Sequence, residues 1–413
     1  MFVRGEKLEH HSLSSILGPL IMKTVEEAKR LIQDLGVSKR SETILVTEAH
    51  KQVLSADVFS PIDMPPFPQS AMDGYALGIG NLLCGSSFKV VGEAAAGCTD
   101  RFHLKAGECV RIFTGAPVPE NSTAVVQQEW VERSGDHIIL QKEVATNMHI
   151  RPQGEQMRTG DVAMEAGTLL NPAAIGFLQM LGVTEVGVFA KPKVGILVTG
   201  NELIEPGKPL KYGQIYESNG QMLLAALSKE CIDGETTRVG DDPNQTIASV
   251  ERSLLKNDIL IISGGISVGD HDHVGTALQY LGVTEVFYEV AQKPGKPIFL
   301  GTADGKAIFG LPGNPAASLT CFYEYVIPVL RKYMGRTDLF LPSFKLPLKN
   351  GTIKAMPRAQ FLKAKVINNE VEILDSQSSA MLNTFALANA LAYVPANSAT
   401  IAEGSIIEVH LLP

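Results

Sequence analysis

Hydrophobic and polar positions between residues 191 and 336 follow two alternating periods. Short apolar, β-branched runs predict strands at 194–199, 236–239, 258–263, 284–290 and 307–310. Apolar residues at helical spacing predict helices at 219–231, 245–256, 273–281 and 315–333. Alternating strands and helices are typical of a doubly wound α/β domain. Ligands of such domains bind beyond the carboxyl ends of the strands, so the loops that follow the strands are the first candidates for chemistry.

The remaining chain predicts smaller domains around this one. Thr24 and Glu27 form a capping box that predicts a helix start, and helical spacing returns after about residue 159. Residues 61–158 begin with a proline- and glycine-rich stretch and continue as short strands. We therefore expect an α/β multidomain protein: a tail at 1–21, a mixed helical linker or dimerisation domain at 22–60 and 159–190, an inserted β domain at 61–158, a central α/β domain at 191–336 and a C-terminal β-barrel-like domain at 337–413. Met22 is a candidate natural start, and the sequence leaves open whether residues 1–21 are native.

The composition limits the classes of binding partner and the cellular compartment that are expected. The net charge of −8 argues against general nucleic-acid binding, for which a basic face is expected. Five scattered cysteines without C-x-x-C spacing argue against a zinc site or a disulfide framework and favour a cytoplasmic location. No apolar run reaches the roughly 18 residues of a membrane span, so no membrane partner is expected.

Two glycine-rich loops follow predicted strands of the central domain. Residues 263–272 read S-G-G-I-S-V-G-D-H-D, and residues 310–315 read G-L-P-G-N-P. Backbone N–H groups and hydroxyls of Ser263, Gly264, Gly265 and Ser267 can cradle an oxyanion. Asp272 is a hard oxygen ligand suited to Mg²⁺, although it can equally cap the next helix. The absence of G-K-[ST] excludes a Walker A loop.

Charged residues follow three other predicted strands of the same sheet. Lys293 and Lys296, in K-P-G-K-P, hold two ammonium groups near each other and suit an anion, although a solvated surface turn is an equal alternative. Glu202 follows the first strand, and Asp241 lies in V-G-D-D-P after another, where a plain turn is the alternative. In the inserted domain Asp73 lies in S-A-M-D-G-Y-A, a tight turn that is most often only structural.

Together these motifs resemble one protein family. S-A-M-D-G-Y-A, F-T-G-A-P-V-P (113–119), T-G-N-E-L (199–203), G-Q-I-Y-E-S-N (213–219), S-G-G-I-S-V-G-D-H-D, K-P-G-K-P and G-L-P-G-N-P occur in this order. The chain from about residue 22 to its end resembles the MoeA family of molybdopterin molybdenumtransferases, which includes the E domain of gephyrin.

The resemblance implies an activity, substrates and partners. It implies insertion of molybdate into adenylylated molybdopterin, with release of AMP and with Mg²⁺ assisting. It also implies a homodimer with the active site between the α/β domain of one subunit and the inserted domain of the other. Molybdopterin adenylyltransferase and molybdoenzyme apoproteins are the partners that it suggests.

The resemblance also implies roles for residues. It assigns catalytic roles to Asp73, Thr114, Glu202, Asp241 and Asp272, of which the last three would hold the metal. Substrate binding falls to Ser263, Gly264, Gly265, Ser267, Lys293, Lys296, Pro312, Pro315 and Arg358. Glu155 is a weaker candidate in the inserted domain.

Departures from the family pattern keep alternatives open. Pro68 and Gln69 stand where the family often has D-N, Gln156 replaces a carboxylate, and Ala317 with Ser318 moves a hydroxyl. The alternatives are a non-catalytic dimeric scaffold, a divergent paralogue of the same fold, and a molybdopterin adenylyltransferase, which the flanking domains argue against. The carboxylates gathered at an anion pocket favour the enzyme over the scaffold. The choice between molybdate and tungstate and the recipient apoenzyme stay open.

Overall fold

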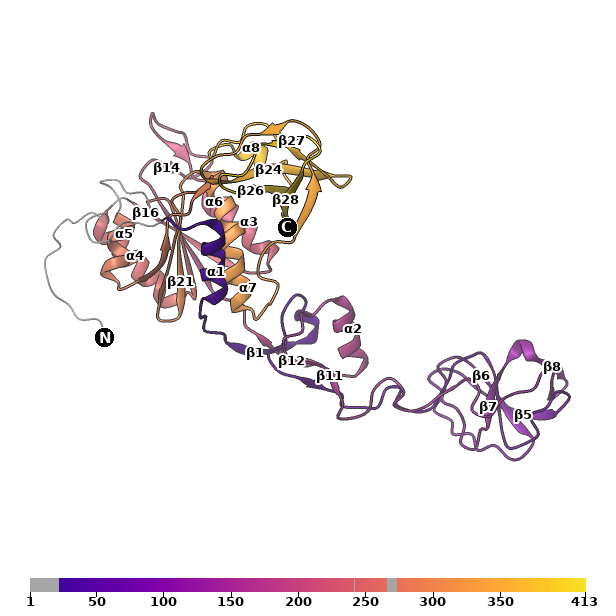
Figure 1. The fold of residues 1–413 in the computed structure, drawn as a ribbon. Helices are drawn as coiled ribbons and strands as arrows, with labels where there is room; N and C mark the ends of the chain where they lie inside the picture. The colour runs from indigo at the N-terminus through magenta and orange to yellow at the C-terminus, as the bar shows by residue number, and fades with distance from the viewer. Residues whose placement is uncertain (1–21, 241, 266–272) are drawn as a thin grey trace. The chain divides into compact units, whose positions relative to one another are not determined.

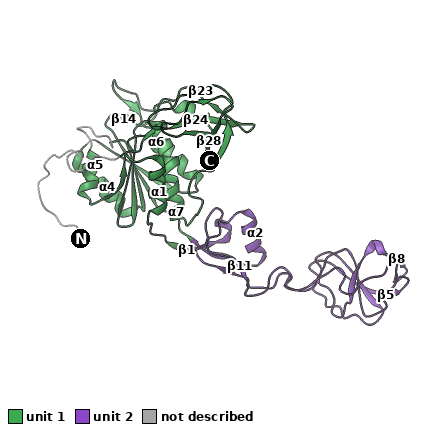
Figure 2. Cartoon of the chain, viewed as in Figure 1, with its two compact units in different colours: residues 1–42, 189–413 green, residues 43–188 purple. Residues whose placement is uncertain are grey.

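The computed structural model of the chain describes residues 22–240, 242–265 and 273–413. These residues divide into two compact units (Figure 2). One contains the described residues up to Glu42 together with Phe189–Pro413, and the other contains Thr43–Val188. The expected domain boundaries are finer than this division and stay a prediction.

The first unit is built around a six-stranded sheet with the order β16-β13-β17-β21-β20-β18 (Figure 1). Its strands are β16 (Gly234–Val239), β13 (Val194–Thr199), β17 (Ile259–Ser263), β21 (Lys306–Leu311), β20 (Phe299–Ala303) and β18 (Thr284–Tyr288). The first four are parallel, and β20 is antiparallel to both neighbours. The five expected strands are present. β20 was not expected, because its short run is interrupted by Gly301.

Helices cover both faces of this sheet, as expected for a doubly wound domain. The helices on one face are α1 (Val25–Asp34), α3 (Asn219–Lys229), α6 (Pro315–Cys321) and α7 (Ile327–Tyr333), and those on the other are α4 (Pro243–Lys256) and α5 (His273–Tyr280). Alternate strand residues point to opposite faces: Ile196 packs in the cluster of the first four helices, whereas Leu197 packs in the cluster of α4 and α5. The predicted capping box is present at the start of α1, where Thr24 accepts a hydrogen bond from the Glu27 N–H and Glu27 accepts one from the Thr24 N–H.

The expected helix at 315–333 is continuous but changes its winding. It consists of α6 (Pro315–Cys321), a π-helical turn (Phe322–Val326) and α7 (Ile327–Tyr333). Pro328 has no N–H to donate to the carbonyl of Glu324, and a proline ring crowds the preceding turn of an α-helix. The wider turn, closed by the Ile327 N–H on the Phe322 carbonyl, accommodates that proline.

The C-terminal part of the first unit is a second sheet. Its order is β19-β24-β26-β28-β22, and β25 pairs with β24. The strands are β19 (Gln292–Lys293), β24 (Ala359–Ile367), β26 (Ala390–Val394), β28 (Ile406–Leu411), β22 (Ser343–Pro347) and β25 (Glu370–Ile373). β23 (Thr352–Ile353) pairs with β27 (Ile401–Ala402), and α8 spans Leu382–Phe385. The edge strand β19 comes from the α/β part of the chain, so the two parts share a strand.

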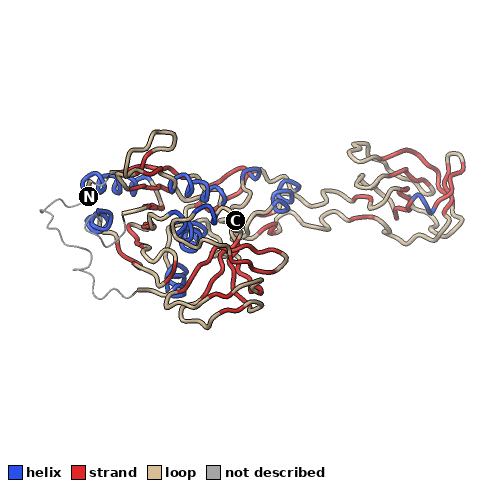
Figure 3. Tube along the Cα trace, turned by 90° about the horizontal axis from the view of Figure 1, so that it is seen from above, coloured by secondary structure: helices blue, strands red, loops and turns tan. Residues whose placement is uncertain are grey.

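The second unit contains the inserted β domain, which is built almost entirely of strands and loops (Figure 3). Its sheet has the order β7-β4-β6-β5-β9-β8. The strands are β7 (Ala124–Gln127), β4 (Gly74–Leu77), β6 (Glu108–Ile112), β5 (Ser87–Ala94), β9 (His137–Leu140) and β8 (Val131–Ser134). The same unit contains α2 (Pro172–Met180), packed with the short helix Val46–Glu48, and paired strands β2 (Val58–Phe59) and β11 (Val162–Met164). No helix among the described residues is long and apolar enough to cross a membrane.

Candidate functional site

The carboxyl ends of three neighbouring parallel strands meet at one edge of the central sheet. Val198 of β13 lies opposite Ser263 of β17, which in turn lies opposite Leu311 of β21. The loops that follow these strands line a pocket of about 720 Å³. Its lining includes Ser263, Gly264, Gly265, Pro312, Pro315 and Glu202. The tertiary structure therefore brings together six of the residues that the sequence nominated.

Glycine is required where the loop leaves β17. Gly264 and Gly265 have φ of +89° and +63°, in the left-handed region that favours glycine. A Cβ at Gly265 would lie 2.9 Å from Oγ1 of Thr199 at the end of β13. The loop can thus approach the neighbouring strand closely only because these side chains are absent.

Asn219, the last residue of the G-Q-I-Y-E-S-N motif, connects two parts of the pocket. Its Nδ2 donates to Ser263 Oγ at 2.9 Å and to the Gly313 carbonyl at 2.8 Å. The carbonyl can only accept, so this contact identifies the atom that faces it as the nitrogen. The residue therefore links the end of β17 to the loop before α6. A polar residue directly after G-Q-I-Y-E-S was the only signal in the sequence.

Glu202 presents a carboxylate at the pocket. A Cβ at Gly200 would meet Glu202 Oε1 at 2.7 Å, so the missing side chain makes room for the carboxyl group. The second carboxylate of the pocket, Glu217, accepts a hydrogen bond from the Gly220 N–H at 2.8 Å and caps the start of α3. Glu202 is therefore the better metal ligand among these two described residues.

Three basic residues come from the two parts that share β19. Lys293 lies opposite Gln360 of β24, and Arg358 directly precedes that strand. Because the pairing is parallel, Arg358 follows in register opposite Ala291, two residues before Lys293. Lys296 Nζ forms an ion pair with Glu289 Oε1 at 3.0 Å, whereas the Lys293 side chain is exposed. Glu289 therefore orients one of the two ammonium groups.

The C-terminal domain also contributes a wall of the pocket. The Ser379 carbonyl accepts hydrogen bonds from the N–H groups of Ala316 and Ala317, and its hydroxyl accepts one from Asn314 Nδ2 at 3.2 Å. Ala380 lines the pocket itself. Sequence reasoning missed this segment, because neither its composition nor its spacing indicates a site.

Asp73 and Thr114 are brought together inside the inserted domain. Asp73 Oδ1 accepts hydrogen bonds from the backbone N–H and from the hydroxyl of Thr114, each at 2.8 Å. The backbone bond, followed by the hydroxyl bond, lowers the pKa of the Asp73 carboxyl. Both residues are exposed, so the pair is an ionised acceptor at the surface.

Three nominated residues, Asp241, Ser267 and Asp272, lie outside the described residues. Two of them are expected metal ligands. Among the side chains of residues 22–240, 242–265 and 273–413 there is no group of three or more His, Cys, Asp or Glu that could hold a metal ion. Mg²⁺ commonly takes only one or two carboxylates together with water and substrate phosphates. Glu202 at the pocket rim fits that requirement.

Comparison with known proteins decides the family. Residues 23–182 match the MoeA N-terminal region (domain I and II), residues 195–332 a probable molybdopterin binding domain, and residues 345–412 the MoeA C-terminal region (domain IV). A molybdopterin molybdenumtransferase of Haemophilus influenzae is 33% identical over 410 residues, which cover 95% of this chain and 100% of the relative. The chain belongs to the MoeA family.

Other members of the MoeA family are similar to this chain over almost its full length. Molybdopterin molybdenumtransferase 2 of Mycobacterium tuberculosis is 32% identical and covers 94% of this chain and 99% of its own. A crystal structure of the molybdopterin biosynthesis MoeA protein from Pyrococcus horikoshii has a TM-score of 0.81 at 30% identity, covering 94% of this chain and 99% of that one. The resemblance and the fold class expected from the sequence are therefore confirmed.

The departures from the MoeA pattern lie in different surroundings. Ala317 and Ser318 are both buried in α6, and the Ser318 hydroxyl has no hydrogen-bond partner. Gln69 lies in β3 (Gln69–Ser70), which pairs with β10 (Ile150–Arg151), whereas Gln156 is exposed. The moved hydroxyl therefore points into packed protein rather than to a ligand, and it is the departure with the clearest structural consequence.

Proposed function

We propose that the protein is a molybdopterin molybdenumtransferase. It inserts molybdate into adenylylated molybdopterin and releases the molybdenum cofactor, AMP and water. The observation that carries the proposal is the pocket at the carboxyl edge of the sheet, next to a segment that bears Lys293 and Lys296, in a chain of the MoeA family.

The charges suit the proposed substrates. Molybdate is a tetrahedral dianion, so it needs cations and hydrogen-bond donors. Lys293, Lys296 and Arg358 supply the cations, and charge-assisted contacts to an oxyanion are stronger than neutral ones. Ser263, Gly264, Gly265, Pro312 and Pro315 shape the pocket for the organic substrate, and Ser267 is assigned to the same role by resemblance.

Metal assistance is part of the proposal. Glu202 would hold Mg²⁺ together with Asp241 and Asp272, and the ion would offset the negative charge that develops as the phosphoanhydride breaks. The residues of the protein itself bind the two substrates, keep their charged groups in register and orient the ammonium of Lys296 through Glu289.

The proposal also includes a cytoplasmic homodimer. Asp73 and Thr114 of one subunit would act with the lysines of its partner, and a closed two-fold dimer would then hold two equal sites. The interacting proteins would be a molybdopterin adenylyltransferase and molybdoenzyme apoproteins. Family membership supports these points.

The test is AMP release from adenylylated molybdopterin in the presence of Mg²⁺ and molybdate, with tungstate compared at equal concentration. Lys293→Ala should raise the molybdate concentration needed for half-maximal release. Lys349→Ala is the matched control, because that lysine is paired with Glu372 on an exposed face of the C-terminal sheet. Absence of AMP release from the unaltered protein would refute the enzyme and favour a scaffold.

A further inference from the structure

Gln292 is a fully buried polar residue whose hydrogen bonds go to the segment that carries the two lysines. Its Nε2 donates to the carbonyl of Pro294 at 3.0 Å and to that of Gly295 at 3.3 Å, and its Oε1 accepts from the Tyr325 hydroxyl. Burying an amide costs free energy unless its polar atoms are hydrogen-bonded. Here both the nitrogen and the oxygen of the amide have partners. Two of the donor contacts hold the backbone between Lys293 and Lys296, and a third reaches Cys321 Sγ at 3.7 Å.

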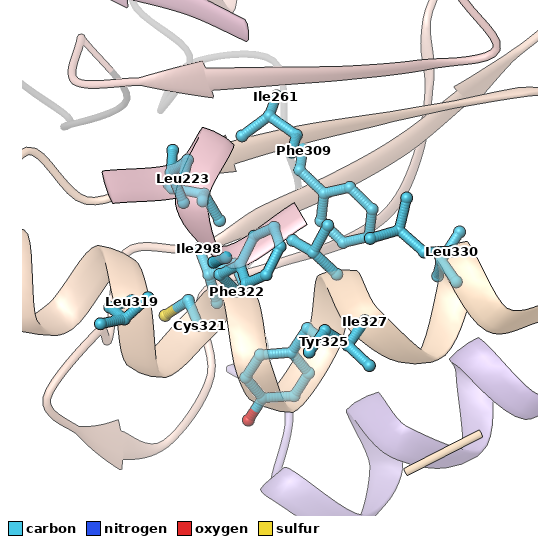
Figure 4. Packing of buried hydrophobic residues seen from close by; sticks show 14 of the residues in the cluster. Leu223, Ile261, Ile298, Phe309, Leu319, Cys321, Phe322, Tyr325, Ile327 and Leu330 are labelled. Carbon is cyan, nitrogen blue, oxygen red and sulfur yellow. The ribbon is translucent and has the colours of Figure 1, made fainter. Parts of the chain in front are cut away.

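Tyr325 reaches Gln292 from the π-helical turn. Its ring is fully buried and packs edge-to-face against Phe287, with the ring centroids 6.1 Å apart. Figure 4 shows Phe322 and Phe309 on one side of this helix and Tyr325 on the other. π-helical turns occur often at functional sites. The turn that Pro328 imposes thus contains the one tyrosine whose hydroxyl holds Gln292.

Gly295 closes the segment against the same helix. It has φ of +84°, and a Cβ there would lie 2.4 Å from Sγ of the buried Cys321 and 3.1 Å from Gln292 Nε2. The segment is therefore packed against Cys321 of α6 in addition to its hydrogen bonds with Gln292. Its other edge is fixed by the pairing of Lys293 with Gln360 in the second sheet.

We propose that Gln292 and Tyr325 are positioning residues that hold Lys293 and Lys296 in register for the anionic substrate. Two like charges on a mobile loop would move apart, and the geometry needed for a compact dianion would be lost on average. The buried Gln292–Tyr325 pair restrains the backbone between Lys293 and Lys296, so the two ammonium groups keep their spacing. Both side chains are fully buried, and neither lines the pocket, so their role is to position the lysines rather than to act in catalysis.

The experiment compares two tyrosine-to-phenylalanine variants from the same long helix, and it rests on the proposed function. Tyr325→Phe removes only the hydroxyl that holds Gln292. Tyr333→Phe removes the hydroxyl of another buried tyrosine, which donates to the Gly305 carbonyl at 2.7 Å in the turn between β20 and β21. This turn precedes the first residues of β21, at the edge of the sheet opposite the pocket. The half-saturating molybdate concentration, the half-saturating concentration of adenylylated molybdopterin, kcat and the melting temperature are measured for each.

For Tyr325→Phe we expect about a fivefold rise in the half-saturating molybdate concentration, which corresponds to about 1 kcal/mol. The value for adenylylated molybdopterin should stay unchanged. Both variants lose one buried hydrogen bond and should lower the melting temperature by similar amounts. Only Tyr325→Phe should change the molybdate dependence. Equal molybdate dependence of the two variants would overturn the positioning role.

The Lys293→Ala variant distinguishes a failure of the positioning role from a failure of the proposed function. If Lys293→Ala raises the molybdate requirement and Tyr325→Phe does not, the positioning role fails while the anion site stands. If Lys293→Ala has no effect either, the anion site itself is wrong, and the positioning role falls with it.

Discussion

Glu324 is a buried carboxylate whose loss should destabilise one unit of the protein and leave the other unchanged. It is 2% exposed and lies in the π-helical turn. Lys29 Nζ is 2.8 Å from Oε2, and His410 Nδ1 is 2.7 Å from Oε1. The three groups join α1, the long helix and β28, so the carboxylate connects the α/β part of the first unit to its C-terminal sheet.

The magnitude follows from the pKa of Glu324. Burial alone would raise this pKa, but the charges of Lys29 and His410 and the bonds they make lower it from 4.5 to about 2. Each tenfold change in an equilibrium is about 1.4 kcal/mol, so the native environment favours the ionised carboxylate by about 3 kcal/mol. Glu324→Gln removes the charge and leaves the partly buried ammonium of Lys29 without its carboxylate, and breaking a buried pair typically costs about 3–5 kcal/mol.

The pH dependence has a definite sign. Because the folded pKa of Glu324 is below the usual 4.5, its contribution is fully present above pH 4.5 and is lost as the pH falls towards about 2. The stability difference between the unaltered protein and Glu324→Gln should therefore be smaller near pH 2 than above pH 4.5.

The assay uses the two units as each other's reference. Trp130 is the only tryptophan of the chain and lies in the second unit, so its fluorescence reports on that unit. Hydrogen exchange of peptides from residues 315–333 reports on the first unit. For Glu324→Gln we expect the melting temperature of the first unit to fall by about 10 °C, at about 2–4 °C per kcal/mol for a unit of this size, with the Trp130 transition unchanged.

Glu408→Gln is the matched control. Glu408 faces the other ring nitrogen of His410 at 3.2 Å but is 41% exposed, and exposed ion pairs contribute at most about 1 kcal/mol. If Glu324→Gln destabilised the first unit no more than Glu408→Gln does, the buried network would not have the proposed energetic role.

Two further outcomes are expected. Gly295→Ala should destabilise the protein and raise the half-saturating molybdate concentration, because the new Cβ would meet Cys321 Sγ. Gly351 is the matched control, since it has the same φ of +84° but no atom within 4 Å of the added Cβ. Gly351→Ala should cost only the backbone strain of about 1 kcal/mol and leave the molybdate dependence unchanged. Equal effects of the two alanines in thermal unfolding and AMP release would contradict this reasoning. Mixed dimers of an Asp73→Ala chain and a Lys293→Ala chain should regain up to about half of the unaltered activity per dimer at limiting molybdate, and no recovery despite demonstrated subunit exchange would place both residues in one subunit.

Local patterns in the sequence determined the elements of the central domain. The apolar runs at 194–199 and 307–310 and the helical spacing at 315–333 appear as β13, β21 and the long helix. Thr24 and Glu27 determined the start of α1 through contacts three residues apart. Interactions of this range are encoded in neighbouring residues, so they can be read without knowledge of the fold. Ordered motifs similarly sufficed to predict the MoeA family.

Only the tertiary structure decided which distant residues meet. Sequence patterns predicted neither β20 nor the role of Lys293 in a strand of the C-terminal sheet, because pairing of Lys293 with Gln360 joins residues far apart in the chain. The support of the lysine segment by Tyr325 was equally hidden, since a buried tyrosine in an apolar helix is indistinguishable from core until its hydroxyl has a partner. Short-range order is encoded locally, whereas long-range contacts depend on how the elements pack together. The sequence therefore determined the elements and the family, and the packing decided which side chains support the site.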